Sequence, residues 1–139
     1  MDSRAARIVD VNLNRLTEGL RVVEDICRLA LEDKRLLASV RALRARIGRE
    51  TRALRRAVIA HRSSETDPGR PDRFDRGRRA NLEDVLAANL KRCEEAARTL
   101  EEVLKIDETG LAARLKAARF RLYDLEKRSV LAARRGSVD

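Results

Sequence analysis

Apolar residues recur along most of this chain in alternating steps of three and four. This spacing places them on one face of an α-helix and predicts amphipathic helices that bury that face. The pattern divides into four segments, each charged on its opposite face, as in helical bundles. In chain order the apolar stripes are Leu13, Leu16, Leu20, Val23, Cys27 and Ala30; Leu36, Val40, Leu43, Ile47, Leu54 and Val58; Leu86, Leu90, Cys93, Ala97, Leu100 and Leu104; and Leu111, Leu115, Ala118, Leu122 and Leu125.

Short connections separate the first segment from the second and the third from the fourth. They read "EDK" at 32–34 and "DETG" at 107–110, and connections of this length join antiparallel helices. Between the two pairs lies a longer stretch with both prolines, many arginines and no apolar period. We therefore predict an all-α, single-domain four-helix bundle over 1–139, with a helical hairpin at 4–60, a basic loop at 61–80 and a second hairpin at 81–135.

The first and third segments carry the same polar ladder. "VNLNRLTEGLRVVED" at 11–25 and "ANLKRCEEAARTLEE" at 88–102 place Asn, Arg, Glu, Arg and a carboxylate at every third position. Steps of three drift by about 60° around a helix, so the ladder is not a single stripe. The repeat indicates that the two hairpins arose by internal duplication. The matched pairs are Asn12 with Asn89, Arg15 with Arg92, Glu18 with Glu95, Arg21 with Arg98, Glu24 with Glu101 and Asp25 with Glu102.

Asn12 and Arg15, with their copies Asn89 and Arg92, border the apolar seam beside a small residue. In the first copy that residue is Gly19, and a glycine inside a helix costs about 0.5–1 kcal/mol relative to alanine, which suggests a packing or binding reason. Asparagine and arginine can bind the polar edge of a ring and an anion. Under the alternative interpretation, the ladder only forms ion pairs on the helix surface.

The formal net charge of +9 favours an anionic partner. Because acidic residues are also abundant, phosphorylated small molecules and nucleic acid fit the charge equally well. The scarcity of aromatic residues disfavours single-stranded nucleic acid. Cys27 and Cys93 both fall on apolar faces and are expected to be buried thiols in a reducing compartment. The chain has no signal peptide and no long apolar run, so we expect a cytoplasmic protein without membrane contact.

Three stretches together resemble a known family of helical domains. They are "RIVDVNLNRLTEGLRVVEDICRLALED", "ANLKRCEEAARTLEE" and "ARFRLYDLEK". The family is the domain found at the N-terminus of long-form thiamine-phosphate synthases, which also occurs alone as a monofunctional hydroxymethylpyrimidine-phosphate kinase. The resemblance runs from about Arg7 to Lys127. The loop matches more loosely, with Ser63 and Pro68 where the family has Asp and Val.

This resemblance implies phosphorylation of 4-amino-5-hydroxymethyl-2-methylpyrimidine phosphate to its diphosphate, with ATP and Mg²⁺, in thiamine biosynthesis. Phosphoryl transfer mainly requires positioning and charge neutralisation, which arginines and Mg²⁺ can provide. The implied partners are ATP and the phosphorylated pyrimidine, with thiamine-phosphate synthase as a further candidate. The roles implied are catalytic for Arg15, Arg92 and Glu18; substrate- or phosphate-binding for Asn12, Asn89, Arg62, Arg121 and Tyr123; and metal-binding for Glu24 and Asp25.

Other functions fit the same residues. A non-catalytic helical module could regulate or bind thiamine-phosphate synthase. A small helical mutase resembling the chorismate mutases would also surround a dianion with arginines, although the doubled ladder and the long basic loop fit it poorly. The rows of small residues could instead face a second subunit, which leaves a homodimer open.

Overall fold

A computed structural model describes residues 1–71 and 77–138, and these residues form a bundle of four long helices. The helices are α1 (Ser3–Leu29), α2 (Lys34–Val58), α3 (Leu82–Leu104) and α4 (Thr109–Val138). A single 3-10 turn, η1 (Ile59–His61), extends α2. The described residues contain no strand, and the predicted all-α bundle is confirmed.

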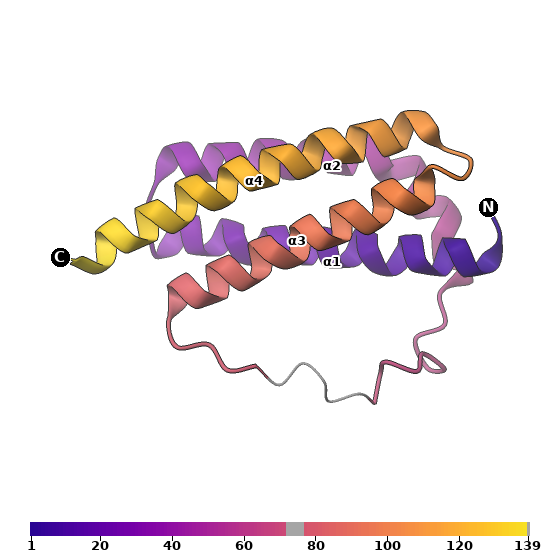
Figure 1. The fold of residues 1–139 in the computed structure, drawn as a ribbon, viewed down its shortest axis with the longest axis horizontal. Coiled ribbons are helices and arrows are strands. Elements are labelled where there is room, and N and C mark those ends of the chain that lie inside the picture. Colours follow the sequence, from indigo (N-terminus) through magenta and orange to yellow (C-terminus); the bar gives the residue numbers. More distant parts are fainter. Residues whose placement is uncertain (72–76, 139) are drawn as a thin grey trace.

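The two hairpins pack side by side (Figure 1). Helix α1 contacts both α2 and α3, and helix α4 also contacts both α2 and α3. The helices α1 and α3 run in opposite directions. The helix α2 ends at one end of the bundle, and α3 begins at the other end (Figure 1). This arrangement brings the two copies of the polar ladder onto neighbouring, antiparallel helices. None of the helices is long and apolar enough, over the described residues, to cross a membrane.

The helices begin at side chains that accept a backbone N–H of the first turn. Asp2 accepts the Ala5 amide at 2.9 Å and Asp33 accepts the Leu36 amide at 3.0 Å. At α3, Asn81 accepts the Asp84 amide at 2.9 Å. Such caps satisfy amides that have no partner inside the helix and typically contribute about 1 kcal/mol each.

The predicted apolar stripes form the core, with a few exceptions. Nearly all of their members are buried in one continuous cluster that joins all four helices. Ala30 is exposed because α1 ends at Leu29, one residue before it. Leu54 and Leu111 are only half-buried, at the edge of the cluster. Periodicity therefore identified the buried faces, and the errors lie at the ends and edges of the helices.

The start of the long loop is fastened to the beginning of α1. Nδ1 of His61 lies 3.3 Å from Oγ of Ser3. The guanidinium of Arg62 donates two hydrogen bonds to Asp10, from Nε to Oδ2 at 2.7 Å and from Nη2 to Oδ1 at 2.8 Å. Asp10 is almost completely buried, so this bidentate pair holds the loop against a fixed point of α1.

Candidate functional site

A pocket of about 660 Å³ lies between α1 and α3, a size typical of small-molecule sites. The residues that line it come in five pairs, each consisting of a residue and its copy in the duplicated hairpin. We call this cavity the α1–α3 pocket. Its lining consists of Asn12, Arg15, Glu18, Gly19 and Val22 from α1, and Asn89, Arg92, Glu95, Ala96 and Thr99 from α3.

The two helices approach each other closely at Gly19. A methyl group added there would lie 2.6 Å from Sγ of Cys93 and 3.3 Å from the backbone oxygen of Asn89. The thiol of Cys93 in turn donates a weak hydrogen bond to the carbonyl oxygen of Leu16 at 3.5 Å. Leu16 and Cys93 are themselves separated by the repeat length of 77 residues. A residue in contact with its own copy indicates that an approximate two-fold axis passes between α1 and α3 at this point.

The two asparagines of the pocket are held in the same way. Nδ2 of Asn12 donates to the carbonyl oxygen of Ile8 at 2.9 Å, and Nδ2 of Asn89 donates to that of Val85 at 2.8 Å. Both bonds span one helical turn and fix the amide plane. One N–H and the carbonyl oxygen of each amide are left for a ligand, which suits the paired donor and acceptor of an aminopyrimidine edge.

The charged residues of the pocket are more exposed than the asparagines. Arg15, Arg92, Glu18 and Glu95 are all exposed at its mouth. Arg15 has no ion pair or hydrogen bond with another side chain in the part of the chain that the structure describes. The structure thus brings together the residues predicted as catalytic with both predicted asparagines, and two cations with two carboxylates surround one opening.

Glu24 and Asp25, predicted as metal ligands, do not line this pocket. The Glu24 side chain is only 4% exposed, and its carboxylate contacts Arg21 at 3.2 Å, Arg44 at 3.0 Å and Arg41 at 3.5 Å. These contacts tie α1 to α2. Asp25 points away from the core and is exposed. Over the described residues, no group of three or more His, Cys, Asp or Glu side chains gathers as a metal site would require.

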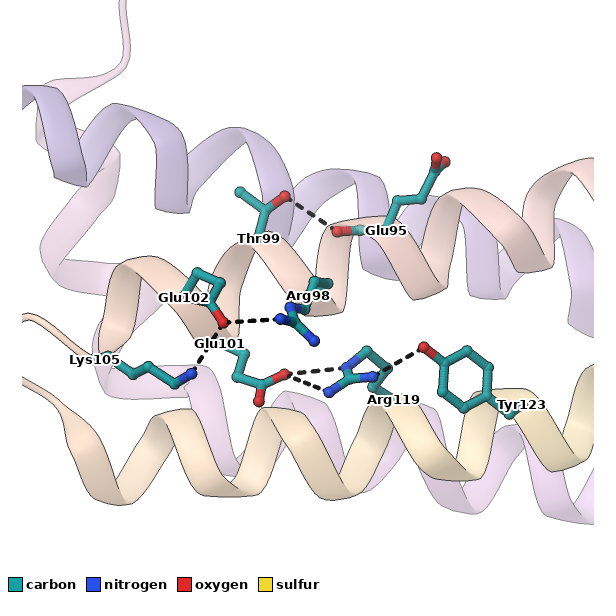
Figure 2. A network of polar contacts seen from close by, with 8 residues as sticks. All are labelled: Glu95, Arg98, Thr99, Glu101, Glu102, Lys105, Arg119 and Tyr123. Atoms are coloured by element: carbon teal, nitrogen blue, oxygen red, sulfur yellow. Dashed lines mark hydrogen bonds and ion pairs between the residues drawn. The ribbon is translucent and has the colours of Figure 1, made fainter.

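The copy of Glu24 makes the equivalent contact in the second hairpin. Glu101 binds Arg119 of α4 at 3.0 Å, and both side chains are less than one-tenth exposed. Figure 2 shows this pair continuing to the hydroxyl of Tyr123, which accepts from Nη1 of Arg119 at 2.9 Å. In the same view Glu95 lies on the other side of α3. In each hairpin, the carboxylate of Glu24 or of its copy Glu101 therefore forms an ion pair with an arginine of the second helix.

The two predicted binding residues on α4 lie away from the α1–α3 pocket. Tyr123 belongs to the ion-pair chain just described, with its ring edge-on to Phe120 and Arg119 over its face. Arg121 lines a different hollow, between α2 and α4, together with Ser39 of α2. Neither residue is among those that line the α1–α3 pocket.

Arg62, predicted to bind phosphate, is engaged by Asp10 instead of facing the pocket. The hydrogen bonds with Asp10, followed by its negative charge, raise the pKa of the Arg62 guanidinium. Arg62 also lines a hollow of about 290 Å³ between α1 and the loop. Sequence patterns missed Asp10, whose partner is 52 residues away. One feature of the sequence could have indicated that Asp10 is buried and paired. It follows the buried Val9 on the apolar face of the first helix, where a carboxylate needs a partner.

Glu94 is a second buried carboxylate that the sequence patterns did not identify. It is 3% exposed, and one of its oxygens, Oε2, has no hydrogen-bond partner among the described residues. Its other oxygen contacts Nζ of Lys91 at 2.9 Å, and Lys91 lies 3.6 Å from Glu126 of α4. Burial raises the pKa of Glu94, and the nearby Glu126 adds to this effect against the opposing effect of Lys91. Glu94 packs inside the second hairpin and does not line the α1–α3 pocket.

Comparisons with known proteins identify the family to which these features belong. Residues 7–128 match the ThiD2 family. The chain is 42% identical over 130 residues to the thiamine-phosphate synthase of Synechococcus sp. (strain CC9605), which covers 91% of this chain and 35% of that protein. It is 43% identical over 129 residues to the thiamine-phosphate synthase of Thermosynechococcus vestitus, covering 89% of this chain and 35% of that protein.

A similar match is found with the thiamine-phosphate synthase of Gloeobacter violaceus, at 42% identity over 122 residues. The chain thus spans about a third of the length of these curated relatives, 35% in each case. No solved structure matches the chain. Because the family match covers nearly all of the helical bundle and both copies of the ladder, the chain belongs to the ThiD2 family.

Proposed function

We propose that this protein acts in thiamine-phosphate biosynthesis and binds a phosphorylated pyrimidine in the α1–α3 pocket. Membership of the ThiD2 family and the names of the relatives support the pathway. The observation that carries the proposed ligand is the lining of the pocket, which pairs two anchored asparagines with two arginines around one opening. Asparagine amides match the edge of an aminopyrimidine, and arginines match its phosphate.

The reaction that we propose is transfer of the terminal phosphoryl group of ATP to this phosphate. The bond between the γ-phosphorus and the β–γ bridging oxygen breaks, and a new bond forms between that phosphorus and an oxygen of the acceptor phosphate. ADP leaves with the electron pair of the broken bond. The attacking oxygen is already anionic near neutral pH, so no side chain needs to remove a proton. The protein's task is to bring two anions together, which the arginines at the pocket mouth can do by neutralising charge.

The residues of the pocket fit a magnesium ion that is carried by phosphates. Mg²⁺ usually takes one or two carboxylates together with phosphate oxygens and water, so it does not require a complete cage of protein ligands. Glu18 and Glu95, one from each helix, are the pocket carboxylates that would hold it. When bound, Mg²⁺ would neutralise charge on the transferred phosphoryl group. We prefer these two residues to Glu24, because the Glu24 carboxylate is already in contact with three arginines.

A second candidate function is a non-catalytic module that binds the phosphorylated pyrimidine beside a thiamine-phosphate synthase. It is favoured by the relatives, which carry the name of the synthase and extend well beyond the segment that matches this chain. The two candidates share the ligand and the pocket, and differ only in whether ATP is consumed.

The experiment that tests the proposal measures binding and turnover with wild-type protein and a matched pair of variants. Arg15→Ala removes a pocket cation, whereas Arg52→Ala removes an exposed arginine of α2 that does not line the pocket. Loss of a charge-assisted contact should weaken binding of the pyrimidine phosphate about tenfold or more in Arg15→Ala. Helicity by circular dichroism should be the same in all three proteins, and Arg52→Ala should bind normally.

Turnover separates the candidates. Formation of the pyrimidine diphosphate and ADP by the wild type, and its loss in Arg15→Ala, would establish the kinase. Binding of the pyrimidine phosphate without consumption of ATP would establish the non-catalytic module. Equal binding by the wild type and Arg15→Ala would rule out the α1–α3 pocket as the site. Conversion of chorismate to prephenate, assayed in parallel, would point instead to the mutase.

A further inference from the structure

A second hollow continues from the α1–α3 pocket toward the N-terminal end of α1. It has a volume of about 400 Å³ and shares Asn12 and Arg15 with the pocket. We call it the arginine hollow because three of the side chains around it are arginines. Its lining consists of Arg4, Arg7, Ile8, Val11, Asn12, Arg15 and Asp67.

The arginine hollow is continuous with the hollow under the loop. The two share Arg7, Val11 and Asp67, so three neighbouring cavities follow one face of α1. The loop that closes the far end is held by the bidentate pair between Arg62 and Asp10. We call these three cavities together the groove. Its end near the loop is formed by α1 and by a loop segment that the Arg62–Asp10 pair holds in place.

Two arginines of this groove form no ion pair with any residue that the structure describes. Arg7 is half-buried and Arg15 is exposed, and neither has an ion pair or hydrogen bond with another side chain among residues 1–71 and 77–138. In contrast, Arg21, on the same helix, is paired with Glu24. Cations without an ion-pair partner about two helical turns apart, around a common cavity, are suited to an elongated anion that carries several phosphates.

The duplication shows that this end of the groove has diverged from its copy. The counterparts of Arg4 and Arg7, 77 residues later, are Asn81 and Asp84. Asn81 accepts the Asp84 amide at 2.9 Å, and Asp84 accepts the Ala80 amide at 3.1 Å, so both side chains cap α3. Where the start of α1 presents two arginines to a hollow, the equivalent positions of α3 therefore hold a neutral amide and a carboxylate that cap the helix.

We infer that the arginine hollow holds the polyphosphate of a nucleoside triphosphate, whose terminal phosphate meets the acceptor phosphate at Arg15. This inference rests on the proposed function, because it supplies that reaction with a place for its second substrate. Arg7 clamps the polyphosphate, and Arg15 lies at the boundary where both phosphates are within reach of one guanidinium. The half-buried Val11 and the exposed Ile8 give the nucleoside an apolar surface.

Asp67 fits a sugar better than a phosphate in this arrangement. Its Oδ1 accepts the Gly69 amide at 2.8 Å, which fixes the carboxylate at the rim of the hollow. A carboxylate repels phosphate but accepts hydrogen bonds from ribose hydroxyls. The nucleoside is therefore expected toward the loop, and the phosphates toward Arg15.

The test compares Arg7→Glu with Arg52→Glu, which reverses an exposed charge outside the groove. Calorimetry would measure dissociation constants of each protein for a non-hydrolysable ATP analogue, for inorganic tripolyphosphate and for the pyrimidine phosphate. Arg7→Glu should weaken binding of the ATP analogue and of tripolyphosphate by about tenfold or more, because a charge-assisted contact is replaced by repulsion. Binding of the pyrimidine phosphate should change little, and Arg52→Glu should resemble the wild type throughout. Arg7→Gln, which removes the charge without reversing it, replaces Arg7→Glu if that variant does not fold.

The outcomes distinguish this inference from the proposed function. Unchanged affinity of the Arg7 variant for the ATP analogue and tripolyphosphate would overturn the inference, even if the pyrimidine phosphate still binds the α1–α3 pocket. Failure of the wild type to bind either polyphosphate would also overturn it. If the wild type binds polyphosphate through Arg7 but does not bind the pyrimidine phosphate, the arginine hollow stands as a polyphosphate site and the proposed function fails.

Discussion

The close contact between α1 and α3 at Gly19 makes a strong prediction, because alanine is normally the better residue inside a helix. In Gly19→Ala the new methyl group would lie 2.6 Å from Sγ of Cys93, whereas such atoms pack best at about 3.5–4.0 Å. Rotating the thiol would relieve only part of the crowding, since the backbone oxygen of Asn89, at 3.3 Å, would still lie closer than an ordinary van der Waals contact. Overpacking of a core contact costs about 1–3 kcal/mol.

The matched control is Gly48→Ala in α2. A methyl group there would meet nothing within 4 Å, and Gly48 is exposed in the middle of its helix. Alanine should raise the free energy of unfolding by about 1 kcal/mol through helix propensity alone. The same gain of about 1 kcal/mol offsets part of the clash at Gly19, so Gly19→Ala should lower the free energy of unfolding by about 0–2 kcal/mol. Gly19→Ala should therefore be less stable than Gly48→Ala by about 1–3 kcal/mol.

Urea unfolding followed by circular dichroism would measure both changes, with the slope against urea expected to stay constant. The double variant Gly19→Ala with Cys93→Ala should recover part of the loss, because it removes the sulfur that the methyl group meets. Residues in contact typically show coupling of about 0.5–3 kcal/mol in such cycles. If Gly19→Ala stabilised the protein as much as Gly48→Ala, the close approach of α1 and α3 would be refuted.

Three further predictions concern the buried polar groups. Glu101→Gln should lower the free energy of unfolding by about 3 kcal/mol by leaving its buried arginine partner without a countercharge, whereas Glu102→Gln in an exposed ion pair should be nearly neutral by the same urea assay; equal effects would contradict the assigned burial. Glu94→Gln should raise the free energy of unfolding near pH 7. The raised pKa of Glu94 means that the folded state binds the proton more tightly than the unfolded state, so the ionised carboxylate destabilises the fold above that pKa, and this effect is absent below the ordinary value of 4.5. A difference in stability between Glu94→Gln and the wild type that does not change with pH would contradict this reasoning. Burial raises the pKa of Cys27 to about 11 and that of Cys93 to about 12, so both thiols should react with a disulfide reagent at about pH 8 only after unfolding, and rapid labelling of the folded protein would count against their burial.

The sequence was sufficient to predict the helices because their stripes are long, regular and bounded by caps and short connections. It also identified the pocket residues Asn12, Arg15 and Gly19, because a polar pattern repeated on two helices is visible without any structure. It could not assign Glu24. Periodicity places this residue beside the apolar seam, but a carboxylate in that position can face a cavity or an arginine of the next helix. The arginine contacts on α2 decide between these only after the helices are packed.

The loop was harder to interpret for a different reason. Arg62 was recognised as a cation near the site, but its partner Asp10 is distant in sequence and lies within a helix with many apolar neighbours. Charge patterns describe which residues can bind an anion and do not reveal which cations the protein already neutralises. That distinction separates Arg62, which is paired with Asp10, from Arg7 and Arg15, which have no ion pair among the residues that the structure describes.

The duplication also limits how well the pocket can distinguish two different substrates. A pocket with two equivalent halves presents the same groups to both ends of a ligand, so it cannot by itself distinguish a phosphoryl donor from an acceptor. Any reaction between two unlike substrates requires the halves to differ. Here the paired asparagines, arginines and glutamates are the same in both halves, whereas Gly19 and Val22 correspond to Ala96 and Thr99. Beyond the pocket, Arg4 and Arg7 correspond to the capping residues Asn81 and Asp84. The difference in charge thus lies just outside the pocket, where a second, more highly charged substrate would be distinguished from the first.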